Sequence, residues 1–278
     1  MKHNTLTILA LMLATSLSSH AAITMALRLD ASELTAGAIT TWEDSSHSVA
    51  NVAASANSND VTQTGSAQPT VVLAAQNGLS VVRFDGTDDY MDNSATSYTV
   101  GSVFAVAYHN ATTFPAGGNG YQGLYGGDDS ADSIYYTGTG SSNAWFGGEL
   151  DSQYLNGASS TIALTNPSAF NLYSGTDDSP NLLVGQSIGK DRNIGARYWN
   201  GDIAEIIVYE EELSDFDRQG VEVYLDEKWG LGQNLATTYG AGTYNTDLYA
   251  LSIAVPEPSS TALLGLGGLA LMLRRKRS

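Results

Sequence analysis

Apolar and polar residues alternate in short runs along most of the chain, and this pattern predicts β-strands. The runs occupy residues 25–30, 79–85, 98–108, 121–125, 133–137, 144–147, 153–155, 170–173 and 182–188. In the second half of the chain they recur at intervals of roughly ten residues, with Gly, Asn and Asp between them, which is typical of an antiparallel sandwich. Residues 45–68 lack this period and are expected to form a loop with at most one short strand.

Two turn signals predict how neighbouring strands connect. The Gly-Thr-Asp segment at 86–88 should turn the strand at 79–85 back into a partner strand at 89–92. The pair Asn200-Gly201 fits a type I′ hairpin turn. The segment that follows, 203–209, is apolar on both faces, which predicts a central strand or one covered by another element.

One helix is expected close to the end of this body. Ser214 is a good N-cap, and Asp215 and Asp217 place negative charge in the first helical turn. Apolar residues then recur at helical spacing, so the helix should cover residues 215–228 and end before Gly230.

The N-terminus has the pattern of a secretory signal peptide. A basic residue, Lys2, is followed by an apolar stretch at 6–17 and by small residues leading to Ala21. We expect cleavage after Ala21 or Ala22, so the signal peptide covers residues 1–21.

The last residues form a second distinctive segment. Val255-Pro256-Glu257-Pro258 precedes an apolar run and four basic residues at 274–277. As a helix the apolar run would rise roughly 20 Å, while a hydrocarbon core is about 30 Å thick. The residues alone leave two interpretations open, a weak membrane helix and a processed sorting signal.

The order of these parts resembles the PEP-CTERM sorting signal of Gram-negative bacteria, with a short transmembrane segment. The resemblance implies that residues 255–278 are recognised and removed by an exosortase after the secretion machinery has carried the protein through the inner membrane. The destination would be the cell surface, the outer membrane or the extracellular matrix. The protein would contact the membrane only through this tail, before processing.

Segments near both ends of the body resemble the LamG-like, concanavalin A-type lectin/glucanase domain. They lie at 82–90 (Val-Arg-Phe-Asp-Gly-Thr-Asp-Asp-Tyr), 199–209 and 224–230. The resemblance implies an all-β antiparallel jelly-roll sandwich over residues 22–231, with one short C-terminal helix, in addition to the signal peptide and the hydrophobic tail helix. Residues 232–254 would then form a linker, or add a strand at 248–253.

Charge and composition narrow the choice of partners. The chain has 12 basic and 29 acidic residues, a formal net charge of −17, and no cysteine. This acidity disfavours nucleic acid as a partner. With no cysteine and only four histidines, two of them in the signal peptide, a zinc site or a Ser-His-Asp triad is nearly excluded.

Closely spaced aspartates are candidate calcium ligands, because calcium takes about six to eight oxygens. We assign a calcium cofactor to Asp128, Asp129 and Asp132. Two other groups have the same character: Asp85, Asp88 and Asp89, and Asp177 with Asp178. The alternative for each group is turn chemistry, in which the aspartate bonds its own backbone.

Polysaccharide binding would need exposed aromatic rings with polar neighbours. Four aromatic residues among Gly and Asp in the middle of the chain are the best candidates: Tyr125, Tyr135, Tyr136 and Trp145. Core packing is the alternative for each of them. Trp42, Trp199 and Trp229 flank the strands and helix that define the fold, so we expect them in the core.

One segment, Glu149-Leu150-Asp151-Ser152-Gln153, resembles the Glu-x-Asp-x-Glu strand of laminarinase-like glycosidases. Retaining hydrolysis needs a carboxylic acid as proton donor, and Gln153 occupies that position. We therefore expect no enzyme, but an exported protein that binds or scaffolds polysaccharide. A hydrolase with a degenerate motif and a purely structural surface protein are the alternatives.

Overall fold

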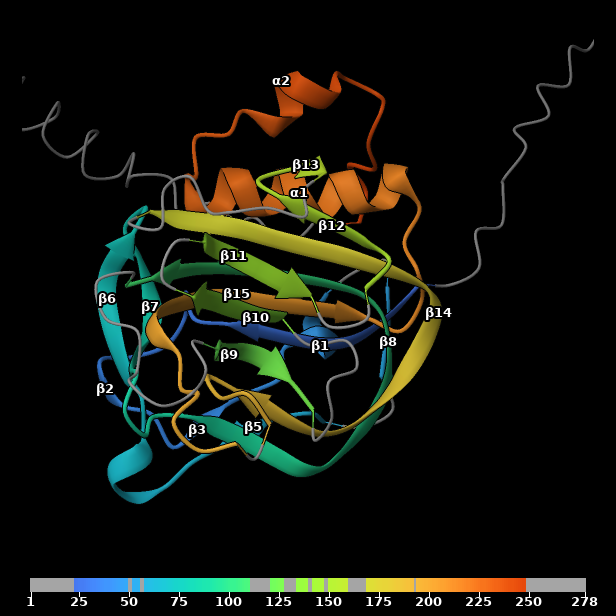
Figure 1. Ribbon diagram of the computed structural model, residues 1–278. Helices are drawn as coiled ribbons and strands as arrows, with labels where there is room; N and C mark the ends of the chain where they lie inside the picture. The colour runs from blue at the N-terminus through green and yellow to red at the C-terminus, as the bar shows by residue number, and fades with distance from the viewer. Residues whose placement is uncertain are drawn as a thin grey trace, which may run out of the picture.

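The computed structural model describes residues 23–49, 52–55, 58–110, 121–127, 134–139, 142–147, 150–159, 169–192 and 194–248. In this part of the chain, 15 strands form one hydrogen-bonded network, antiparallel except where β1 meets β4 (Figure 1). The strands are β1 Thr24–Asp30, β2 Gly37–Ala38, β3 Thr41–Trp42, β4 Ala53–Ala54, β5 Val61–Thr62, β6 Thr70–Gln76, β7 Leu79–Asp85, β8 Met91–His109, β9 Tyr121–Gly126, β10 Ile134–Thr139, β11 Ser142–Gly147, β12 Ser152–Leu155, β13 Ala158–Ser159, β14 Phe170–Ile188 and β15 Asn200–Tyr209. The helices are α1 Asp215–Trp229 and α2 Leu235–Tyr239.

Two long strands, β8 and β14, join two layers of the sheet. They pair from Phe170 opposite Tyr108 to Ile188 opposite Met91, and they curve together down one side of the molecule (Figure 1). At one end of this pair, β14 also pairs with β12, and β8 also pairs with β15. At the other end, β14 also pairs with β9, and β8 also pairs with β5. The sheet therefore folds over and encloses a core.

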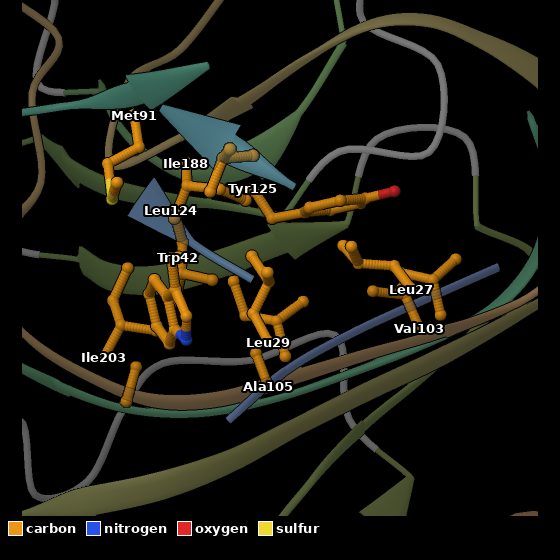
Figure 2. Close-up of a cluster of buried hydrophobic side chains, with 14 of the residues drawn as sticks. Leu27, Leu29, Trp42, Met91, Val103, Ala105, Leu124, Tyr125, Ile188 and Ile203 are labelled. Carbon is orange, nitrogen blue, oxygen red and sulfur yellow. The ribbon is translucent and has the colours of Figure 1, made fainter. Parts of the chain in front are cut away.

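The inner core lies between these layers. Its fully buried members include Leu27, Leu29, Val103, Ala105, Leu124, Tyr125, Ile188 and Ile203 (Figure 2). Burying a side chain of this size stabilises the fold by about 1.5–3 kcal/mol. Trp42 and Trp199 are 0% and 1% exposed in this cluster, which confirms that they are core residues.

A second core lies between the outer face of one layer and α1, which runs across that face (Figure 1). Phe104 of β8 and Ile207 of β15 contribute from the sheet, and Leu225 and Trp229 contribute from the helix. Because successive strand residues point to opposite faces, β15 buries both of its faces in two different cores. This confirms the prediction of a central strand at 203–209 and of a core position for Trp229.

The helix prediction is also confirmed. Ser214 Oγ accepts a hydrogen bond of 3.2 Å from the backbone N–H of Asp217, which caps the start of α1. Gly230 ends the helix in the left-handed conformation, at φ 58°, where glycine carries no side-chain penalty.

A buried ion network ties α1 to the sheet through Glu205, whose side chain is fully buried. Its Oε1 accepts hydrogen bonds from Arg28 Nε at 3.0 Å and from the Tyr224 hydroxyl at 3.2 Å. Its Oε2 accepts from Lys228 Nζ at 2.7 Å and from Trp229 Nε1 at 2.8 Å. Four donors from β1 and α1 therefore meet one carboxylate on β15.

Both predicted hairpins are wrong. Strand β7 does not pair with residues 89–92, because β15 lies between β7 and β8. Asn200-Gly201 is not a turn but the start of β15. A Cβ on Gly201 would lie 2.0 Å from the carbonyl oxygen of Tyr108, so glycine is needed there for the close approach of two strands.

The domain extends beyond the predicted boundary at residue 231. Leu235 of α2 and Leu248 are each 3% exposed and pack in the second core, between the sheet and α1. Residues 232–248 are therefore not a free linker. The signal peptide, the sorting signal and most of the possible strand at 248–253 lie outside the described residues. Among the helices that the structure describes, none has the length and apolar character needed to span a bilayer.

Candidate functional site

Four side chains line up across four neighbouring strands on the outer face of the sheet, beyond the end of α1. Phe170 of β14 lies opposite Tyr108 of β8, Tyr108 lies opposite Asp202 of β15, and Asp202 lies opposite Arg83 of β7. Directly opposed residues in antiparallel strands point to the same face. We call Phe170, Tyr108, Asp202 and Arg83 the cross-strand row.

The cross-strand row forms one side of an open cleft of about 480 Å³. Gln76 and Leu231 complete it on the side of α1, together with Ala169. Gln76 Nε2 donates a 2.6 Å hydrogen bond to the carbonyl of Trp229, the last residue of α1. The cleft therefore exists because the helix stops before it covers the whole face.

The polar half of the cross-strand row is an ion pair with two hydrogen bonds. Arg83 Nε and Nη2 donate to the two oxygens of Asp202 at 2.7 and 2.8 Å. The Asp202 side chain is 5% exposed, whereas the Arg83 side chain is 54% exposed. The hydrogen bonds to Asp202 raise the pKa of Arg83 above its ordinary value, although partial burial of Arg83 acts to lower that pKa.

The aromatic half consists of Tyr108 and Phe170, with ring centroids 5.8 Å apart and ring planes tilted by 38°. Both rings are half-buried, so part of each faces the cleft. Within the described residues, neither the Tyr108 hydroxyl nor Arg83 Nη1 has a hydrogen-bond partner. The site thus combines apolar ring surface with two polar groups that make no hydrogen bond to the described residues.

The ion pair of the cross-strand row gives a first prediction about stability. Arg83→Ala should lower the free energy of unfolding by about 1–3 kcal/mol, because it leaves the buried Asp202 carboxylate without its two donors. Urea denaturation measures the change. The double variant Arg83→Ala, Asp202→Asn should be more stable than Arg83→Ala alone, because it no longer buries an unpaired carboxylate. Strict additivity of the two single changes would contradict this coupling.

A second polar cleft, of about 460 Å³, lies at the other end of α1. There Arg218 stacks on the Tyr154 ring, with its guanidinium carbon 3.7 Å from the ring centroid. Arg218 also donates to Asp215 and, at 2.7 Å, to both oxygens of the buried Glu222. The ring contact connects the helix to β12, and every donor nitrogen of Arg218 has a protein partner.

The aspartates at 85, 88 and 89 lie within reach of one metal ion. Asp85 Oδ1 accepts hydrogen bonds from three backbone N–H groups of the turn, including that of Thr87 at 2.7 Å. This is the turn chemistry that the sequence left open for this group. Burial, with the nearby Asp85 carboxylate adding to it, raises the pKa of Asp89 to about 6.

Asp89 gives a second prediction. A raised pKa means that the folded state holds the proton more tightly, so stability falls as the pH rises from the ordinary value of 3.8 to about 6. Asp89→Asn removes this titration while keeping an acceptor for the backbone N–H of Asp85. Between pH 4 and pH 7, the free energy of unfolding of the wild type should therefore fall relative to that of the variant. Parallel curves would contradict it.

Another carboxylate group joins Asp151 to Asp177 and Asp178. Asp151 Oδ2 accepts from the backbone N–H of Asp178 at 3.2 Å, and Asp177 accepts from Ser179 and Asn181. The strand after Asp151, β12, pairs with β14, which explains why this segment lies next to Asp177 and Asp178 of β14. Gln153 lies in β12, and Glu149 lies outside the described residues.

The predicted ligand-binding aromatic residues are placed as follows. Tyr125 is fully buried, and its hydroxyl lies 3.0 Å from that of Tyr98 (Figure 2). The expectation of an exposed ring is wrong for Tyr125, because its side chain fills the space between the two layers. Tyr135 and Tyr136 lie in β10 and Trp145 in β11, with Tyr136 opposite Trp145. The predicted calcium ligands Asp128, Asp129 and Asp132 lie outside the described residues.

The sequence reading missed the cross-strand row. Two members carry a weak signal: Arg83 is a charged residue between the apolar residues Val82 and Phe84, and Asp202 directly precedes the apolar run of β15. Opposite charges inside two buried strands suggest a pair. The pairing itself depends on strand register across 119 residues of sequence, which no local pattern reveals.

Comparison with known proteins identifies the tail and leaves the body without an assignment. The family described as the PEP-CTERM protein-sorting motif matches residues 254–277. This motif is a signal recognised by exosortase, and it marks an exported protein of the cell envelope or surface in Gram-negative bacteria. No curated protein matches the chain.

Among solved structures, the chain is similar to domain 4 of AbnA, a GH43 extracellular arabinanase from Geobacillus stearothermophilus, in complex with arabinotriose. The identity is 13%, the TM-score is 0.30, and the match covers 69% of this chain and 95% of that chain. At this TM-score the two folds share too little to transfer a ligand or an activity.

Proposed function

We propose that this exported protein binds or scaffolds polysaccharide outside the cell through a jelly-roll domain, without catalysing a reaction. The observation that carries the proposal is the cross-strand row, where the rings of Tyr108 and Phe170 adjoin the Arg83–Asp202 pair in an open cleft. Ring faces pack against the apolar faces of sugars, and a planar guanidinium donates hydrogen bonds to sugar hydroxyls. The sorting signal supports the proposal, since it directs the protein to the envelope, where polysaccharide is abundant.

A laminarinase-like hydrolase is the second candidate, and one observation favours it. Asp151, Asp177 and Asp178 hold carboxylate oxygens within 4.8 Å of one another, and retaining hydrolysis uses two carboxyl groups about 5 Å apart. Against it, Asp177 is only 3% exposed, and both of its oxygens accept hydrogen bonds from Ser179 and Asn181. Release of reducing ends from a β-glucan, lost in Asp151→Asn, would favour the hydrolase.

Retention of the purified protein on a panel of immobilised polysaccharides tests the proposal. We expect retention on at least one polymer, with no release of reducing ends. Measurements with calcium and with a chelator test whether Asp128, Asp129 and Asp132 hold a calcium ion that binding requires. Absence of retention on every polymer would contradict the binding function and favour a purely structural surface protein.

A further inference from the structure

Building on the proposed function, we infer that the cross-strand row takes an uncharged, linear polysaccharide and holds an extended segment of it across the strands. A single sugar or an acidic polymer is not its ligand. Three features of the site support this: its charge balance, its length and the order of its groups.

The charge balance of the site excludes polymers that depend on attraction between charges. Among the described residues that line the cleft, only Arg83 and Asp202 carry charged side chains, and they neutralise each other through two short hydrogen bonds. The chain as a whole carries a net charge of −17. A polymer of uronic acids would be repelled by this field, and the described residues of the cleft offer it no unpaired cation.

The length of the site exceeds that of one sugar. Phe170, Tyr108, Asp202 and Arg83 lie on four adjacent strands, so three strand-to-strand steps separate the first from the last. At about 4.8 Å a step, the row extends roughly 14 Å across the sheet. A monosaccharide can contact one end of this row, whereas an oligosaccharide contacts both ends.

The order of the groups along the cross-strand row implies that different sugar units of one polymer make different contacts. The two rings lie side by side at one end and present apolar surface, while the guanidinium lies at the other end, where Nη1 has no partner among the described residues. Asp202 is a positioning residue, because it is nearly buried and fixes the plane of the guanidinium. Different sugar units of one polymer therefore meet the rings and the guanidinium.

Calorimetric titration of the full chain tests the inference. The probes are laminarin, glucomannan and dextran as neutral polymers, alginate and polygalacturonate as acidic polymers, and oligosaccharides of increasing length from each neutral polymer that binds. We expect binding to a neutral polymer, with affinity that rises with oligosaccharide length by about ten-fold or more before it levels off. The dissociation constant should change less than about two-fold between about 0.05 M and about 0.5 M NaCl.

Variants assign the binding to the row. Tyr108→Ala should weaken binding by about ten-fold, and Tyr198→Ala, which removes another half-buried ring away from the row, should not. A monosaccharide that binds as tightly as the longest oligosaccharide would overturn the inference, as would tight, salt-sensitive binding of alginate in the cleft. Either result leaves the proposed function intact, whereas failure of every polymer to bind overturns the proposed function itself.

Discussion

Replacing Glu205 by alanine should lower the free energy of unfolding by about 3–5 kcal/mol, the usual cost of removing one partner from a buried ionic network. The side chain is fully buried and accepts hydrogen bonds from Arg28, Tyr224, Lys228 and Trp229. Without it, Arg28 and Lys228 keep their ion pairs with Asp30 but lose the fully buried carboxylate. Urea denaturation at neutral pH measures the loss.

Two further variants separate charge from packing. Glu205→Gln keeps an acceptor oxygen and should cost less than Glu205→Ala. Glu227→Ala removes an exposed carboxylate from α1 and should change stability by less than about 0.5 kcal/mol. A loss below about 1 kcal/mol in Glu205→Ala would show that this network does not fasten the helix to the sheet.

Acid should weaken the same network. Burial alone would raise the pKa of Asp30, but Lys228 and Arg28 outweigh it and hold that pKa below its ordinary value. For a carboxylate with a lowered pKa, the contribution to stability is present above the unfolded-state value of 3.8 and is lost as the pH falls through the lower folded-state value.

Gly201→Ala should cost about 2–4 kcal/mol and also weaken ligand binding, because it forces apart two strands that carry the cross-strand row. The new Cβ would lie 2.0 Å from the backbone oxygen of Tyr108, and the φ of 151° is one that side chains rarely adopt. Since the obstacle is backbone, no side chain can move aside to relieve it. Denaturation and polysaccharide titration of the same preparation measure both effects.

Gly195→Ala is the matched control for this change. A Cβ on Gly195 would meet nothing within 4 Å, so stability and binding should both stay at the wild-type level. If Gly201→Ala behaves like Gly195→Ala, the close approach of β8 and β15 at this point is not required for the fold.

Local chemistry allowed the sequence to predict α1 and the buried strands. Ser214 and the first-turn aspartates mark the start of the helix, and Gly230 marks its end. The double-sided apolar run at 203–209 is likewise a local pattern, and its burial follows from its composition. Such features need no knowledge of distant contacts.

The Asn-Gly pairs show where local reasoning fails. Asn77-Gly78, between β6 and β7, and Asn156-Gly157, between β12 and β13, both adopt the positive φ angles that a type I′ turn requires. Asn200-Gly201 has the same sequence but lies in a strand. Its glycine is needed because the backbone of Tyr108 lies too close for a side chain, not because the chain turns there. The dipeptide alone does not distinguish the two uses.

The cross-strand row depends on register, which explains why the sequence did not reveal it. A shift of one residue in any of its four strands would send that member's side chain to the opposite face. Tyr125 shows the opposite error. The glycines around it suggested an exposed binding residue, but its side chain is buried in the inner core.

The most direct test of the account compares polysaccharide affinity in three proteins: the wild type, Tyr108→Ala combined with Phe170→Ala, and the control Tyr198→Ala. Titration with the neutral polymer that the wild type retains should give equal dissociation constants for wild type and control. The double variant should bind at least about ten-fold more weakly while remaining folded. Undiminished binding by the folded double variant would contradict the claim that the cross-strand row is the polysaccharide site.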